Sequence, residues 1–152
     1  MARIEESIEI AASPADVFRF CHEPGKRPDW DMRVTRVELL TSKPVRQGTL
    51  VRVDAGRAGE VLFSWDGEYI GFQYPISSTV KVLDAAPSSP FKSGNETWQF
   101  TALGGETHLT VIWEYTPRGI LARIGDALGG RASTRRAIRR SLLNLKKLIE
   151  GG

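Results

Sequence analysis

The first apolar residues of the chain recur at every second position. Ile4, Ile8 and Ile10 share one face of an extended segment over residues 3–11, whereas the other face is charged or polar. A period of two with β-branched residues is typical of a strand buried on one side. Similar patterns predict further strands over residues 32–40, 49–54 and 79–84.

A short helix is expected directly after this first strand. Ser13 suits the N-cap position, because its hydroxyl can accept a hydrogen bond from the first turn, and Pro14 suits the first helical position. Prolines and a glycine after Cys21 leave room for at most one more helical turn before Trp30. The first helix should bury Val17, Phe18 and Cys21.

The clearest element is a hairpin over residues 94–103 and 106–116, joined by Gly104-Gly105. A two-residue loop fixes the register, so that paired residue numbers sum to 209. One face of the hairpin is then polar, and the other is aromatic and apolar. The second face carries Glu96, Trp98, Phe100, Leu109, Val111, Trp113 and Tyr115.

Residues 57–78 are expected to contain another hairpin, in which Asp66-Gly67 forms a type I′ turn. The segment is rich in glycine and aromatic residues, among them Phe63, Trp65 and Tyr69. Two interpretations remain open for it. It forms either a lid over a pocket or a small local core beneath a long loop.

The chain turns helical after Pro117. Leu121, Ile124 and Leu128 form one apolar stripe, and Gly129-Gly130 should break or kink the helix. Beyond Arg131 the pattern predicts an amphipathic helix that lies on a core. A helical wheel places Ile138, Leu142, Leu145 and Ile149 on one side, and Arg135, Arg136, Arg139, Arg140, Lys146 and Lys147 on the other.

The order of these motifs resembles the START-like (SRPBCC) superfamily, in particular its polyketide cyclase/dehydrase and lipid-transport branch. The matching segments are Ile8-Glu9-Ile10, residues 12–18, Trp30 before a strand, residues 82–87, residues 104–107 and residues 142–150. The resemblance implies an α+β helix-grip fold. In it a curved antiparallel sheet wraps around a long C-terminal helix, two short helices follow the first strand, and an apolar cavity remains between sheet and helix. Residues 1–152 would form one such ligand-binding domain.

Composition excludes several kinds of chemistry. The chain has 152 residues, one cysteine (Cys21) and two histidines, which leaves no intrachain disulfide and makes multi-cysteine or multi-histidine metal sites poor candidates. We expect no metal and no cofactor. No stretch reaches the roughly 18 apolar residues of a membrane span, and one free cysteine favours a cytoplasmic location.

Three residues are candidates for acid–base chemistry, namely Glu96, Tyr115 and His22. Glu96 falls on the aromatic face, where a carboxylate is costly unless it is paired or protonated, so it could anchor a ligand hydroxyl or move protons. We favour the alternative that it lies near the strand end and reaches solvent or an arginine such as Arg118. For His22 we favour a role as the C-terminal cap of the first helix.

The aromatic face has two interpretations, plain core packing or the wall of the cavity that the resemblance implies. The residues that such a cavity would use are Trp30, Phe63, Trp65, Tyr69, Glu96, Trp98, Phe100, Val111, Trp113, Tyr115, Leu121, Ile124 and Leu128.

Three functions follow from these observations. The first is binding or transport of a hydrophobic small molecule such as a lipid, an isoprenoid or a polyketide. The second is a polyketide cyclase or dehydratase. The third is an interaction module, because residues 118–152 carry a net charge of +7 and residues 1–117 a net charge of −4.

Contact of such a module with an anionic membrane would use Arg136, Arg139 and Arg140. Nucleic acid is disfavoured, because residues 131–147 contain no aromatic side chain. The oligomeric state stays open.

Overall fold

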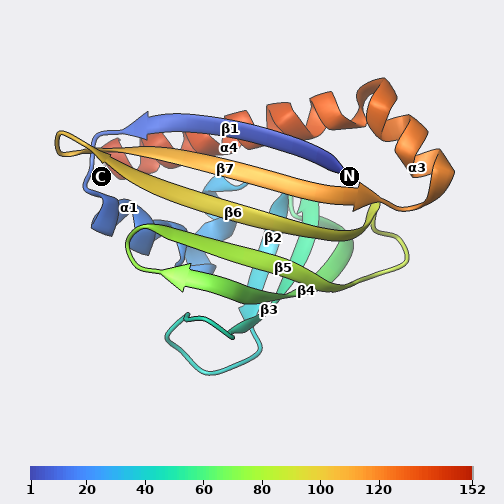
Figure 1. The fold of residues 1–152 in the computed structure, drawn as a ribbon, viewed down its shortest axis with the longest axis horizontal. Coiled ribbons are helices and arrows are strands. Elements are labelled where there is room, and N and C mark those ends of the chain that lie inside the picture. Colours follow the sequence, from blue (N-terminus) through green and yellow to red (C-terminus); the bar gives the residue numbers. More distant parts are fainter. Residues whose placement is uncertain (152) are drawn as a thin grey trace.

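The computed structural model describes residues 1–151 and contains an antiparallel sheet with a long helical C-terminal arm (Figure 1). The seven strands of this sheet lie in the order β1-β7-β6-β5-β4-β3-β2, so β1 and β2 form its two edges. In chain order the elements are β1 (Ala2–Ile10), α1 (Pro14–Cys21), η1 (Pro24–Lys26), α2 (Arg27–Trp30), β2 (Val34–Leu39), β3 (Leu50–Arg57), β4 (Glu60–Gln73), β5 (Ser77–Ala85), β6 (Phe91–Leu103), β7 (Glu106–Pro117), α3 (Gly119–Gly125), η2 (Asp126–Gly130) and α4 (Arg131–Gly151).

The sheet curls into a half-barrel around the C-terminal helix, which confirms the helix-grip fold (Figure 1). The α4 helix packs on β1 and α2. It does so through Ile138, Leu142 and Leu145, which are 0–2 % exposed. Burying an aliphatic side chain of this kind stabilises the fold by about 1.5–3 kcal/mol. The predicted kink is confirmed as well, because the backbone φ and ψ angles of Gly129, between α3 and α4, are not helical.

The local signals at the N-terminus are confirmed. Ser13 accepts a hydrogen bond of 3.2 Å from the backbone N–H of Asp16 and caps α1. Val17, Phe18 and Cys21 are buried, as the helical pattern predicted. They join Ile4 and Ile10 of β1 and the inward residues of β6 and β7 in one continuous core.

The β6–β7 hairpin has the predicted register. Glu96 pairs with Trp113, Trp98 with Val111 and Phe100 with Leu109. Two-residue turn geometry and the alternation of both strands point to the same register, and the structure satisfies both. The aromatic face therefore points into the half-barrel, whereas Thr101 and His108 lie on the other face.

The prediction of a turn at Asp66-Gly67 is wrong. Both residues lie within the continuous β4 strand, and the turn is formed by Ala58 and Gly59, which have φ angles of 53° and 79°. Gly67 is needed for another reason, because a Cβ there would lie 2.7 Å from the Trp65 ring and 2.8 Å from Val80. Residues 60–73 are thus a sheet strand rather than a lid. Tyr69 of this strand packs in a second core cluster with Val34, Val51 and Val53.

Candidate functional site

A cleft of about 660 Å³ lies between the sheet and the helical arm. Its sheet side carries bulky aromatic residues, whereas the helices contribute small residues such as Ala122, Gly125 and Ala137. Small side chains on one wall leave the space that large ones on the other wall would otherwise fill. The aromatic residues that line the cleft are Phe63, Trp65, Phe91, Trp113 and Tyr115.

The apolar stripe of the helical arm faces away from this cleft. Leu121, Ile124 and Leu128 are 86 %, 49 % and 82 % exposed, so the expectation that they wall the cavity is wrong. The orientation of the arm has a visible cause. The Tyr115 hydroxyl donates to Asp126, and Arg131 donates two hydrogen bonds of 2.9 and 3.0 Å to the same carboxylate. Asp126 lines the cleft, so these contacts turn the small-residue face of the arm inward.

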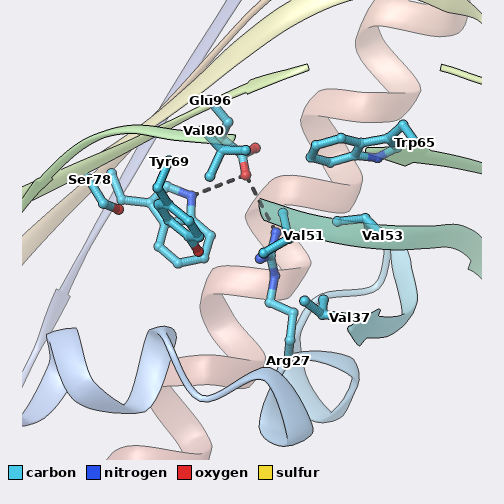
Figure 2. A pocket seen from close by; sticks show the side chains of 10 residues that line it. Arg27, Val37, Val51, Val53, Trp65, Tyr69, Ser78, Val80 and Glu96 are labelled. Atoms are coloured by element: carbon cyan, nitrogen blue, oxygen red, sulfur yellow. Dashed lines mark hydrogen bonds and ion pairs between the residues drawn. The ribbon is translucent and has the colours of Figure 1, made fainter. Parts of the chain in front are cut away.

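A second, much smaller space of about 20 Å³ lies beside Glu96 (Figure 2). It has room for about one water molecule. Figure 2 shows Arg27 reaching from the α2 segment toward Glu96, with Val51 and Val53 of β3 beside it. Arg27 and Glu96 also line the large cleft, so this charged pair lies at the junction of the two spaces. We take the large cleft as the candidate binding site, since the small one cannot hold an organic ligand.

Glu96 is 9 % exposed and belongs to a buried charge network. Its Oε1 accepts a hydrogen bond of 2.8 Å from Arg33, and its Oε2 accepts one of 3.2 Å from the Trp98 indole. The Arg27 guanidinium lies 3.5 Å from Oε2 and stacks on the Trp98 ring, with its Cζ 4.6 Å from the ring centroid. Both carboxylate oxygens are therefore occupied.

Asp31 completes this network from the end of α2. It accepts a hydrogen bond of 2.8 Å from Arg27, and it is contacted by Arg33 at 3.1 Å. Burial alone would raise the pKa of Asp31, but the two guanidinium groups outweigh it and hold this pKa well below its usual range. Two arginines and two carboxylates thus balance in charge, and they tie the α2 segment to the middle of β6.

The expectation of an arginine partner for Glu96 is confirmed, since Arg33 binds its carboxylate. The partner is not Arg118, however, and Glu96 is buried in the middle of β6 instead of reaching solvent at the strand end. Arg118 instead donates hydrogen bonds to the backbone carbonyls of Ala85, Ser89 and Phe91. The position is buried because β6 is covered by the α2 segment, a contact between distant parts of the chain that register alone does not predict.

His22 caps α1, as we favoured from the sequence, but its ring is also partly buried. Its Nδ1–H donates to the Phe18 carbonyl at 2.7 Å, which leaves Nε2 to accept from the Ser78 hydroxyl, also at 2.7 Å. Burial lowers the pKa of His22 to about 4. The neutral ring packs among Phe18, Phe72 and Trp98.

The structure brings only some of the predicted site residues together. Phe63, Trp65, Glu96, Trp113 and Tyr115 line the large cleft, and Tyr69 and Trp98 line the small space. Of the described residues, a third group lies in the core and lines neither space. That group comprises Trp30, Phe100 and Val111, which are 3–4 % exposed.

Sequence reasoning missed Arg27, Asp31 and Arg33. One signal was available, because Arg27 and Asp31 have the i,i+4 spacing of a helical ion pair. The pairing of Arg33 with Glu96 spans 63 residues and could not be read from local spacing.

Within residues 1–151, no helix is long and apolar enough to cross a membrane. The same residues hold no cluster of three or more His, Cys, Asp or Glu side chains that could bind a metal ion.

Comparisons with known proteins agree with this geometry. A family model described as "Polyketide cyclase / dehydrase and lipid transport" matches residues 1–150. No curated protein matches the chain. Among solved structures, protein CV1439 from Chromobacterium violaceum is 16 % identical, with a TM-score of 0.75 over 97 % of this chain and 96 % of that one.

Two further solved structures have the same fold. The Zhui aromatase/cyclase from Streptomyces sp. R1128 is 18 % identical, with a TM-score of 0.70 over 97 % of this chain and 95 % of that one. A START superfamily protein from Mycobacterium smegmatis is 14 % identical, with a TM-score of 0.68 over 98 % and 94 %. At these identities the likeness shows a shared fold.

Proposed function

The chain belongs to the polyketide cyclase / dehydrase and lipid transport family, and from this premise we propose that it binds a hydrophobic small molecule in the cleft. A lipid, an isoprenoid or a polyketide-like compound fits this description. The observation that carries the proposal is the cleft itself, with about 660 Å³ and an aromatic wall. Its volume falls within the roughly 300–1,000 Å³ that is usual for small-molecule sites.

Apolar contact supplies most of the affinity. Each 100 Å² of apolar ligand surface that leaves water contributes about 2.5 kcal/mol, before the cost of ordering the ligand. Trp65 and Trp113 offer large flat surfaces for this contact, and the small residues on α3 and α4 accept a bulky ligand. At the inner end, Arg33 and Glu96 line the cleft, so this end is polar, unlike the aromatic wall.

Three observations favour binding over catalysis. Glu96 is held by two guanidinium groups and an indole, the Tyr115 hydroxyl donates to Asp126, and both ring nitrogens of His22 have partners. Each candidate acid or base is thus engaged in a structural contact. A cyclase or dehydratase would need at least one of them free to face the substrate.

Fluorescence titration with N-phenyl-1-naphthylamine, a neutral apolar probe, tests this proposal. The probe should bind saturably and be displaced by dodecanol. Ala137→Trp places a large ring in the cleft and should weaken probe binding at least tenfold. Ala132→Trp is the matched control, since Ala132 is an exposed residue of α4 outside the cleft lining. Absence of saturable probe binding by the wild-type protein would overturn the proposal. So would an Ala137→Trp variant that binds the probe as tightly as the wild-type protein does.

A further inference from the structure

We propose that the ligand is an anionic amphiphile, whose carboxylate or phosphate head is bound by Arg57, Arg136 and Arg140 at the opening of the cleft. This inference rests on the proposed function and narrows its ligand class. All three arginines line the cleft and are exposed, so they lie where it meets solvent.

The charges that line the cleft are unbalanced. Five arginines line it, against the carboxylates Glu96 and Asp126. Two of the arginines, Arg27 and Arg33, are neutralised by Glu96 and by Asp31 behind them. Asp126 is neutralised by Arg131, outside the lining. Three positive charges therefore remain around the opening.

These three arginines are also free of ion pairs within the described part of the chain. No carboxylate of residues 1–151 lies within 4.0 Å of the guanidinium nitrogens of Arg57, Arg136 or Arg140. Arg136 and Arg140 are one turn apart on α4, and Arg57 ends β3 on the facing wall. A head group between the two walls can thus be reached from both sides. Guanidinium groups suit this role, because they present several donors to a carboxylate or phosphate.

The neighbouring arginines of α4 behave differently. Arg135 and Arg139 both pair with Glu6 of β1, Arg135 at 3.6 Å. The arginine-rich side of the helix is therefore divided into a neutralised half and a cleft-facing half. Arg139 belongs to the neutralised half, whereas Arg136 and Arg140 line the cleft.

An apolar tail is part of the inference. The sheet side of the cleft is aromatic, so a small hydrophilic anion would leave this apolar surface uncovered. A chain or ring system covers this surface while its head stays among the arginines. Binding of the head then requires the tail, and affinity depends on both.

Isothermal titration with dodecyl phosphate, dodecanoate and dodecanol tests the inference. The two anions should bind the wild-type protein at least about tenfold more tightly than dodecanol, since charge-assisted hydrogen bonds replace contact with water. Arg136→Gln and Arg140→Gln should each reduce this preference, the ratio of anion affinity to dodecanol affinity, about three- to fivefold. Lys147→Gln removes one charge from α4 outside the cleft lining and should keep the preference.

Two further controls distinguish an anionic amphiphile from free phosphate and from an effect of net charge. Inorganic phosphate alone should not displace dodecanol or dodecyl phosphate, and tight binding of free phosphate would overturn the inference. If Lys147→Gln loses as much of the preference as the cleft variants do, the inference is overturned, because the preference then depends on net charge alone. If all three amphiphiles bind equally well, the inference fails and the proposed function stands. If none binds, the proposed function itself has failed.

Discussion

Arg33 donates a 2.8 Å hydrogen bond to Glu96 and thereby joins the segment after α2 to the middle of β6. The two residues are 63 positions apart, and both line the cleft. The contact closes the inner end of the cleft with a balanced set of charges. It also makes the shape of the binding site depend on a buried ion pair.

Replacing Glu96 with glutamine should destabilise the fold. The change leaves Arg27 and Arg33 with Asp31 alone, and an uncompensated charge in a buried network costs roughly 2–4 kcal/mol. Because Glu96 also lines the cleft, ligand affinity should change together with stability. Urea unfolding measures the effect. Glu38→Gln, which removes a carboxylate from an exposed pair with Arg36, should change stability by less than about 1 kcal/mol.

His22 should make stability depend on pH. Burial lowers its pKa from 6.5 to about 4 in the folded protein, so the unfolded chain takes up the proton first as the pH falls. Stability is therefore complete near pH 7 and decreases between about pH 6.5 and 4, by roughly 3 kcal/mol from this residue. His22→Gln should remove this part of the decline, measured by urea unfolding at several pH values. His108→Gln keeps His22, so it should show the full decline.

Tyr115→Phe should loosen the helical arm. The variant loses the hydroxyl that donates to Asp126, a hydrogen bond to a charged group that contributes about 1.5–3 kcal/mol. Amide exchange in residues 119–130 should accelerate about tenfold or more, while exchange in β6 and β7 stays slow. Unchanged exchange in the arm would mean that Asp126 and Arg131 alone hold it in place.

Gly94→Ala should disturb the aromatic wall. A Cβ at Gly94 would lie 2.7 Å from the Trp113 ring and 3.0 Å from the Glu114 carbonyl, so the strand or the ring must move. We expect a loss of about 1–3 kcal/mol and altered tryptophan fluorescence. At Gly71 the nearest atom would be 3.7 Å away, which is ordinary contact, so Gly71→Ala serves as the control. Equal destabilisation by both changes would assign the effect to strand glycines in general.

Local patterns were sufficient for much of the fold. The cap at Ser13, the hairpin register through Glu96 and Trp113, and the kink at Gly129 each follow from a few neighbouring residues, and each is confirmed. The prediction of a turn at Asp66-Gly67 failed because a glycine can serve either a turn or the close approach of neighbouring side chains. Gly67 lacks a side chain so that Trp65 and Val80 can approach, and the sequence cannot distinguish this from a turn.

The site was harder to predict because it depends on distant contacts. The aromatic wall follows from alternation along the strands, so Trp113 and Tyr115 could be placed. The opposite wall could not, because the contact of Tyr115 with Asp126 rotates Leu121 outward and Ala122 inward. The buried partners of Glu96 likewise come from the segment around α2, and no local pattern predicts that this segment lies against β6.

The position of a bound ligand tests the central claim most directly. In a crystal of the complex with an ω-brominated dodecanoate, an anomalous difference map locates the bromine atom. The account predicts a peak inside the cleft, near Trp65 and Trp113, with the carboxylate toward Arg136 and Arg140. A peak outside the cleft, or a cleft without ligand density at saturating concentration, would contradict it.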